Sequence, residues 1–143
     1  MRNLQWSEDH SVLIPELDEQ HRVLHEATEE LRLAVLAGES NDRLEFLAGR
    51  VATRMAAHFR YEEGLMRGSR YSAIDWHERQ HQAAGAKLAL LWETLRGCGG
   101  ASSFAALEEL ADWFVDHVTV ADRMLAAHVR NYERETLKRA QIA

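Results

Sequence analysis

The sequence predicts an all-α protein, an up-down-up-down antiparallel four-helix bundle with an irregular N-terminal arm. Apolar residues recur at alternating spacings of three and four along most of the chain, which is the period of one buried helical face. The 143 residues include a single proline and eight glycines, and most of these glycines lie between the periodic segments. Short connections of this kind make neighbouring helices antiparallel.

The helices can be placed along the chain from this period. We expect one domain over residues 1–143, with an arm over 1–17, the bundle over 18–129, and a C-terminal helical extension or tail over 130–143. The four helices are expected near 18–37, 42–66, 73–96 and 103–129. The apolar seam of the fourth helix contains Leu107, Leu110, Phe114, Ala121 and Met124.

The composition narrows the class of protein. A hydrophobic fraction of 46% and a charged fraction of 28% are typical of a globular domain with a buried core. The formal charge of -6 argues against nucleic acid as the main partner, because phosphate binding needs a clustered basic surface. No stretch is typical of a membrane span or a signal peptide, so we expect a cytoplasmic protein with no membrane contact. Cys98 is the only cysteine, which excludes an intrachain disulfide and a thiolate metal site. No protein partner can be inferred.

Five of the eight histidines and two carboxylates form a spaced series across all four predicted helices. The series consists of His21 on the first helix, His58 and Glu62 on the second, His77 and His81 on the third, and His117 and Asp122 on the fourth. Each lies on or beside the apolar seam, where leucine is otherwise expected. Burying so many polar groups is costly unless something neutralises and coordinates them. The series therefore predicts a metal site.

The direction of the helices supports this prediction. In an up-down-up-down bundle the starts of the first and third helices meet the ends of the second and fourth, so all members of the series converge on one end. Pairs four residues apart share one helical face. His117 and Asp122 are five residues apart, which in an α-helix rotates them by about 140°. We therefore expect Asp122 to reach the site from beside the seam.

The types of ligand narrow the choice of metal. Imidazole and carboxylate without thiolate favour iron, manganese or zinc, and the series is too large for one ion. Two octahedral ions offer about twelve coordination positions. Five histidines would fill five of these positions, two bridging carboxylates four, and a bridging oxo or hydroxo oxygen two, so one position stays open. A histidine-rich di-iron pair with one open position suits the binding of dioxygen.

The same residues resemble a known family. Leu17-Asp18-Glu19-Gln20-His21, His58-Phe59-x-x-Glu62-Glu63-x-Leu65-Met66, Trp6 in the arm and Trp113 before His117 are similar to the corresponding segments of the hemerythrins, in particular the single-domain bacterial type. The resemblance covers about residues 4–128. Phe114 stands where the family usually has leucine.

The resemblance implies a ligand arrangement and a function. His77, His81 and His117 would hold one iron, and His21 and His58 the other. Glu62 and Asp122 would bridge the two, and dioxygen would bind end-on at the iron held by two histidines. The expected function is reversible binding of dioxygen for storage, transport or sensing. The expected protein is not an enzyme and has no catalytic residue, although weak oxidase or peroxidase activity is compatible with the site.

Three alternatives involve the same residues. His77-Glu78-Arg79-Gln80-His81 matches the zinc protease signature, but Ala84 and Lys87 replace the glycine and third histidine of the extended motif. A ferritin-like site needs Glu-x-x-His on two helices, and only Glu78-x-x-His81 is present near the series. A di-iron oxidase, peroxidase or nitric-oxide-handling enzyme is the main alternative. The absence of a base or nucleophile at the open position favours the carrier.

Other residues are expected near the site. Trp113, Phe114 and Leu24 are expected to line the open position and to slow oxidation of the metals. His25, one turn after His21, is expected to be an ordinary, partly exposed histidine, with support of a ligand as the alternative. His10 and His128 have no assigned role. Ligand histidines should donate their second ring nitrogen to carbonyls or carboxylates that the sequence does not identify.

Overall fold

The all-helical fold is confirmed by the computed structural model, which describes residues 6–97 and 100–142. The helices are α1 (Pro15–Leu36), α2 (Asn41–Gly68), α3 (Ile74–Gly97), α4 (Gly100–His117) and α5 (Arg123–Ile142). A short 3-10 helix (Glu8–His10) lies in the N-terminal arm, and a π-helical turn (Val118–Asp122) joins α4 to α5. Cys98 lies outside the described residues. Within them there is no strand, and no helix is both long and apolar enough to cross a membrane.

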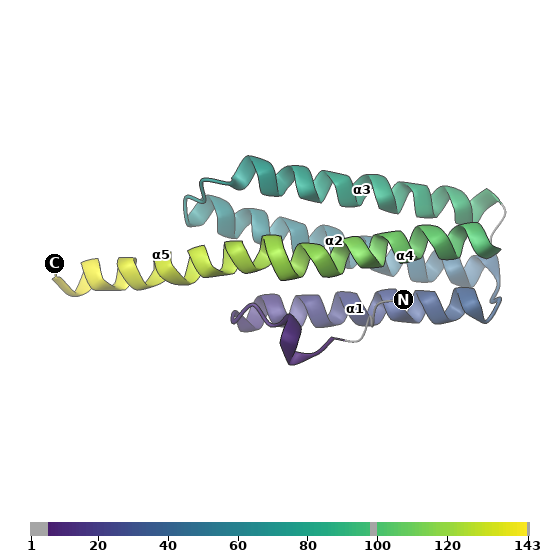
Figure 1. Cartoon of the computed structure of the whole chain (residues 1–143), viewed down its shortest axis with the longest axis horizontal. Coiled ribbons are helices and arrows are strands. Elements are labelled where there is room, and N and C mark those ends of the chain that lie inside the picture. The colour runs from purple at the N-terminus through teal and green to yellow at the C-terminus, as the bar shows by residue number, and fades with distance from the viewer. Residues whose placement is uncertain (1–5, 98–99, 143) are drawn as a thin grey trace.

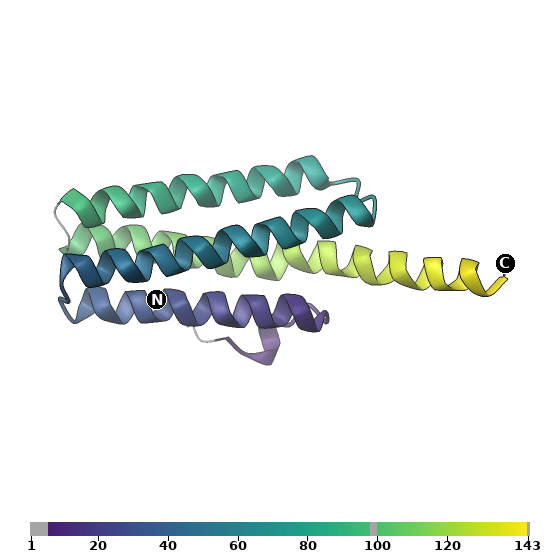
Figure 2. The same cartoon turned by 180° about the vertical axis from the view of Figure 1, so that it is seen from behind.

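The first four helices form a closed ring. α1 packs on α2, α2 on α3, α3 on α4, and α4 on α1, and consecutive helices run in opposite directions (Figures 1 and 2). Their inward faces enclose an apolar core. Its fully buried leucines are Leu17, Leu24, Leu31, Leu47, Leu91, Leu95, Leu107 and Leu110.

The beginning and end of α1 have local causes. The helix begins at Pro15, three residues before the predicted boundary, because the fixed φ of proline suits the first helical position and its missing N–H is not needed there. The helix is followed by Gly38, whose φ of +66° allows the Glu39 amide to donate to the Ala34 carbonyl at 3.1 Å. The Ser40 hydroxyl then accepts from the Arg43 amide at 3.2 Å and caps α2.

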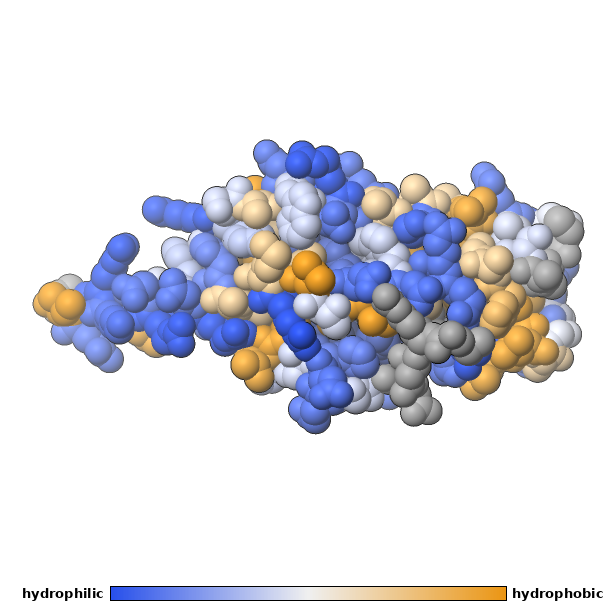
Figure 3. All heavy atoms as spheres, in the orientation of Figure 1, coloured by the Kyte–Doolittle hydropathy of each residue, from blue (hydrophilic) through white to orange (hydrophobic). Residues whose placement is uncertain are grey.

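The predicted fourth helix is longer than expected and contains an irregularity. α4, the π-helical turn and α5 form one continuous rod that extends past the bundle (Figure 1). The protruding part of α5 has a mostly hydrophilic surface (Figure 3). The seam after the π-helical turn differs from the prediction, because Met124 is 50% exposed whereas Leu125 and Ala126 are buried. The wider turn contains one extra residue, which shifts the buried face of α5 by one position.

Candidate metal centre

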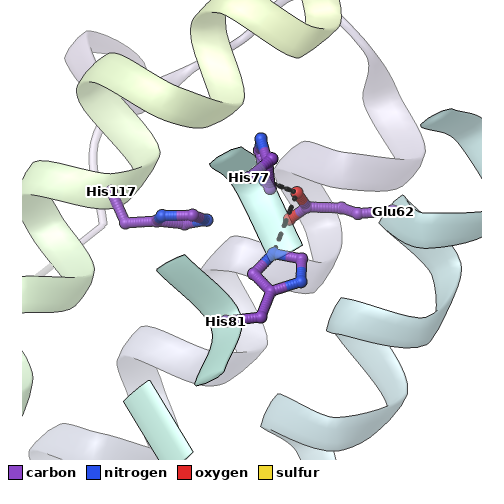
Figure 4. A group of neighbouring side chains, drawn as sticks. All are labelled: Glu62, His77, His81 and His117. Atoms are coloured by element: carbon purple, nitrogen blue, oxygen red, sulfur yellow. Dashed lines mark hydrogen bonds and ion pairs between the residues drawn. The ribbon is translucent and has the colours of Figure 1, made fainter. Parts of the chain in front are cut away.

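The predicted series comes together in the interior, near the end of the bundle formed by the α2–α3 connection. Its members are all buried: His21 from α1, His58 and Glu62 from α2, His77 and His81 from α3, His117 from α4 and Asp122 from the π-helical turn. Figure 4 shows part of this cluster, in which the imidazoles of His77 and His81 from α3 and of His117 from α4 gather around the Glu62 carboxylate from α2.

The cluster divides into two groups that could each hold a metal ion. One group comprises Glu62, His77, His81 and His117, and the other comprises His21, His58, Glu62 and Asp122. Within each group, one ligand atom from every residue lies within 4.8 Å of the others. We refer to these as the three-histidine group and the two-histidine group.

Glu62 faces both groups with different oxygens. Its Oε2 lies 2.8 Å from His77 Nε2 and 3.7 Å from His81 Nε2, on the three-histidine side. Its Oε1 contacts His58 Nε2 and lies 4.0 Å from His21 Nε2, on the two-histidine side.

Asp122 divides its oxygens in the same way. Its Oδ1 lies 3.0 Å from His117 Nε2 and 3.2 Å from His77 Nε2. Its Oδ2 lies 2.9 Å from His21 Nε2 and 3.7 Å from His58 Nε2. Each carboxylate therefore presents one oxygen to each histidine group, as a bridge between two ions requires.

The π-helical turn explains how Asp122 reaches the cluster. We predicted that Asp122 would reach the site from beside the seam, and its carboxylate is fully buried in the cluster. In the wider turn of Val118–Asp122, hydrogen bonds join residues five apart, so residues five apart exceed one full turn by less than they do in an α-helix. Asp122 consequently lies on the same side of the helix as His117. Insertions of this kind are frequent at functional sites.

The buried polar atoms of the cluster fit a bound metal pair. Among the described residues, several of the atoms that face its interior lie close to one another but form no hydrogen bond of normal geometry: His58 Nε2, His81 Nε2, His117 Nε2, Glu62 Oε1 and Asp122 Oδ1. Buried polar atoms without partners are rare in native proteins and call for an explanation such as an ion. Imidazole nitrogens and carboxylate oxygens without thiolate are donors suited to iron, manganese or zinc.

In the metal-free cluster, the two carboxylates raise the pKa of His58 and His77. Burial disfavours the charged form of His58, but the Glu62 and Asp122 carboxylates together outweigh this effect and raise the His58 pKa to about 10. Burial likewise opposes the charged form of His77, yet hydrogen bonds to Asp122 and Glu62 raise its pKa to about 9. Burial and the neighbouring Asp122 charge raise the pKa of Glu62, but His58 and His77 more than offset them and lower it to about 2.

Metal binding is therefore expected to release protons. At pH 7 the metal-free protein carries protons on His58 and His77, and an ion must displace the proton on each Nε2. Calorimetric titration with zinc at pH 7, in two buffers of different ionisation enthalpy, should report about two protons released on full occupancy. Affinity should fall as pH is lowered. An enthalpy independent of the buffer would show that His58 and His77 are not protonated in the metal-free protein.

The metal-free protein should also lose stability at high pH. A histidine whose folded pKa exceeds its unfolded value of 6.5 stabilises the fold below that value, and the contribution is lost as pH rises toward about 9 to 10. The free energy of unfolding of the metal-free protein should fall over this range. The zinc-loaded protein serves as the control and should be less sensitive.

Two residues that the sequence did not identify hold ligand rings in place. His58 Nδ1 donates to Gln20 Oε1 at 2.7 Å, and His81 Nδ1 donates to Glu63 Oε1 at 3.1 Å. Acceptors of this kind were expected from the chemistry of ligand histidines, but their identity was not. Gln20 and Glu63 each directly precede or follow a member of the series, but adjacency on a helix does not show which neighbouring helix a side chain contacts.

The aromatic residues near the cluster lie on different sides of it. Phe114 is buried against the two-histidine group, with its ring centroid 6.0 Å from His21 and 6.5 Å from His58. Trp113 instead stacks on His117 of the three-histidine group, with ring centroids 4.6 Å apart. The buried Leu24 lies one turn after His21 on α1.

His25 differs from the prediction. It was expected to be partly exposed, but only 2% of its surface is accessible. Its ring centroid lies 5.0 Å from that of Phe114 and 5.2 Å from that of His10 in the N-terminal arm. The arm thus covers a histidine that the helical period of α1 alone would leave near the surface.

Comparison with known proteins agrees with this geometry. A bundle of four antiparallel helices with a buried histidine and carboxylate cluster at one end defines a helical cation-binding domain. The family model that matches the chain describes the hemerythrin HHE cation binding domain, and it covers residues 12–129. Myohemerythrin of Theromyzon tessulatum is 26% identical over 118 residues, which are 82% of this chain and 87% of that protein. No solved structure gives a significant match. The chain belongs to the hemerythrin family.

Proposed function

We propose that this protein binds dioxygen reversibly at two iron ions, for storage, transport or sensing. The observation that carries the proposal is the division of both carboxylates between the two histidine groups. That arrangement suits two neighbouring ions joined by Glu62 and Asp122. The similarity to a myohemerythrin and the match to the hemerythrin family support iron as the metal.

The chain's residues have distinct proposed roles. His77, His81 and His117 would hold one iron and His21 and His58 the other, with Glu62 and Asp122 shared between them. An oxo or hydroxo bridge would complete the pair, and the two ferrous ions would supply the two electrons that reversible dioxygen binding requires. The iron held by His21 and His58, with one histidine fewer, would keep a coordination position for a small ligand. Phe114 borders this group and excludes water from it.

The proposal favours a carrier over an enzyme. Every described imidazole and carboxylate inside the cluster faces another member of the cluster through Nε2 or a carboxylate oxygen. These groups are therefore assigned to metal binding, and none is left as a separate base or nucleophile. A di-iron oxidase, peroxidase or nitric-oxide-handling enzyme on the same site is the alternative that the following experiment distinguishes.

The function is tested by following the visible spectrum of the iron-loaded protein. The protein is reduced anaerobically, exposed to oxygen and then placed under vacuum. A carrier is expected to give a coloured adduct that persists for many minutes, bleaches under vacuum and returns when oxygen is readmitted. Immediate conversion to the oxidised protein with release of hydrogen peroxide, measured in parallel, would instead support an enzyme and contradict the carrier.

A further inference from the structure

Two histidines of the cluster are held by acceptors of different charge. His58, in the two-histidine group, donates to the neutral amide oxygen of Gln20 at 2.7 Å. His81, in the three-histidine group, donates to the Glu63 carboxylate at 3.1 Å. Among the described residues, Nδ1 of His21, His77 and His117 has no hydrogen-bond partner. Within that part of the chain, His81 is thus the one cluster histidine whose Nδ1 meets a carboxylate.

Both contacts fix which ring nitrogen can bind a metal. The Gln20 amide oxygen and the Glu63 carboxylate oxygen only accept hydrogen bonds, so Nδ1 of each imidazole carries the hydrogen. In the neutral ring, Nε2 then has a free lone pair, and Nε2 is the atom that faces the cluster in both cases. The two acceptors therefore select the same tautomer and hold each ring in a ligating orientation.

The surroundings of Glu63 and Gln20 also differ. Glu63 is 30% exposed, and Phe59 of the same helix stacks on His81 with ring centroids 3.9 Å apart and an interplanar angle of 8°. The ring is thus held between an aromatic face and a carboxylate. Gln20 borders a cavity of about 310 Å³ whose lining also includes Glu19 and Arg54, which carry opposite charges.

We propose that Glu63 is a positioning residue that makes the three-histidine ion the more easily oxidised of the two. A carboxylate that accepts from Nδ1 raises the basicity of the imidazole, and a more basic ligand favours the ferric over the ferrous ion. The neutral Gln20 orients His58 without this effect. This inference rests on the proposed di-iron function. It adds that the two irons differ in reduction potential, and that the three-histidine iron has the lower potential.

The test uses two variants that exchange the charge of each acceptor while keeping its size. Glu63→Gln removes the carboxylate at His81, and Gln20→Glu adds one at His58. The control is Glu19→Gln, which removes the same charge from the residue next to Gln20. The Glu19 side chain is 60% exposed and contacts Arg22 rather than a histidine. Iron content and the potentials of the ferric to ferrous couples are measured for each, with the electron passing to a soluble mediator.

The expected changes have opposite signs. Replacing a residue that supports a metal ligand typically weakens metal affinity about tenfold or more. If Glu63→Gln weakens the affinity for the ferric ion tenfold and leaves the affinity for the ferrous ion unchanged, the potential of the three-histidine iron rises by about 59 mV. Gln20→Glu should lower the higher potential, so the separation between the two couples shrinks in both variants. Glu19→Gln should change neither of the two potentials by a comparable amount.

The outcomes separate this inference from the proposed function. Two irons per chain with potentials that follow these signs support it. Two irons per chain with potentials unchanged, or shifted equally in Glu63→Gln and Glu19→Gln, overturn the inference and leave the di-iron proposal intact. If Glu63→Gln loses iron, the shift in Gln20→Glu decides the matter. A wild-type protein that takes up fewer than two irons overturns both.

Discussion

Asp122→Ala is expected to abolish binding of both metal ions and to destabilise the metal-free protein by about 3–5 kcal/mol. The reason is the position of its carboxylate between the two groups. One oxygen lies 3.0 Å from His117 Nε2, and the other lies 2.9 Å from His21 Nε2. Without it each proposed ion would lose a ligand, and His58 and His77 would lose a carboxylate that stabilises their charged forms.

Two further variants control for loss of volume and for loss of surface charge. Asp122→Asn keeps the shape of the side chain and should still lose most metal affinity, because a neutral amide does not balance two cations. Asp42→Ala removes an exposed carboxylate at the start of α2 and should retain full iron content. Iron is measured by elemental analysis and stability by urea unfolding. Retention of one firmly bound iron in Asp122→Ala would show that its carboxylate does not bridge the two positions.

His117→Ala is expected to reduce iron content to one equivalent or less and to lower thermal stability. His117 belongs to the three-histidine group alone, where its Nε2 faces Asp122. An ion present at about a thousand times its dissociation constant stabilises a protein by about 4 kcal/mol, and this contribution disappears with the ion. The melting temperatures of the metal-loaded and metal-free forms should therefore approach each other in the variant.

The matched control is His128→Ala, a histidine of α5 outside the cluster. His128 Nε2 donates to the Ser69 carbonyl at 2.8 Å, so its loss should cost about 1 kcal/mol without any loss of iron. Unchanged iron content in His117→Ala would count directly against its assignment as a ligand. Equal iron loss in both variants would indicate a general effect of destabilisation.

The arrangement of the cluster follows from spacing and helix direction. His58 and Glu62 share one helical face, as do His77 and His81, because each pair is four residues apart. The direction of each helix then places both pairs at one end of the bundle, where the structure has them. Neither step requires knowledge of side-chain contacts, so both can be taken from the sequence.

The π-helical turn is the main feature that helical periodicity did not predict. The turn brings Asp122 into the cluster. It also places Leu125, instead of the predicted Met124, on the buried face of α5. An ideal period of 3.6 residues does not include such an insertion. The five-residue spacing between two candidate ligands on one helix was itself a signal, since only a wider turn allows both His117 and Asp122 to face inward.

Contacts between segments far apart in the chain could also not be predicted from the sequence. His25 is buried because His10 of the arm and Phe114 of α4 lie against it. The acceptors Gln20 and Glu63 contact rings from neighbouring helices. A helical period shows which face of one helix is buried, but it does not show which side chain of another helix meets it.

The central claim is that one cluster holds two metal ions, and counting those ions tests it most directly. Metal-free protein is titrated anaerobically with ferrous iron, dialysed to remove unbound metal and analysed for iron and protein. Two equivalents per chain are expected, both lost together in Asp122→Ala. One equivalent or less in correctly folded wild-type protein would contradict the claim.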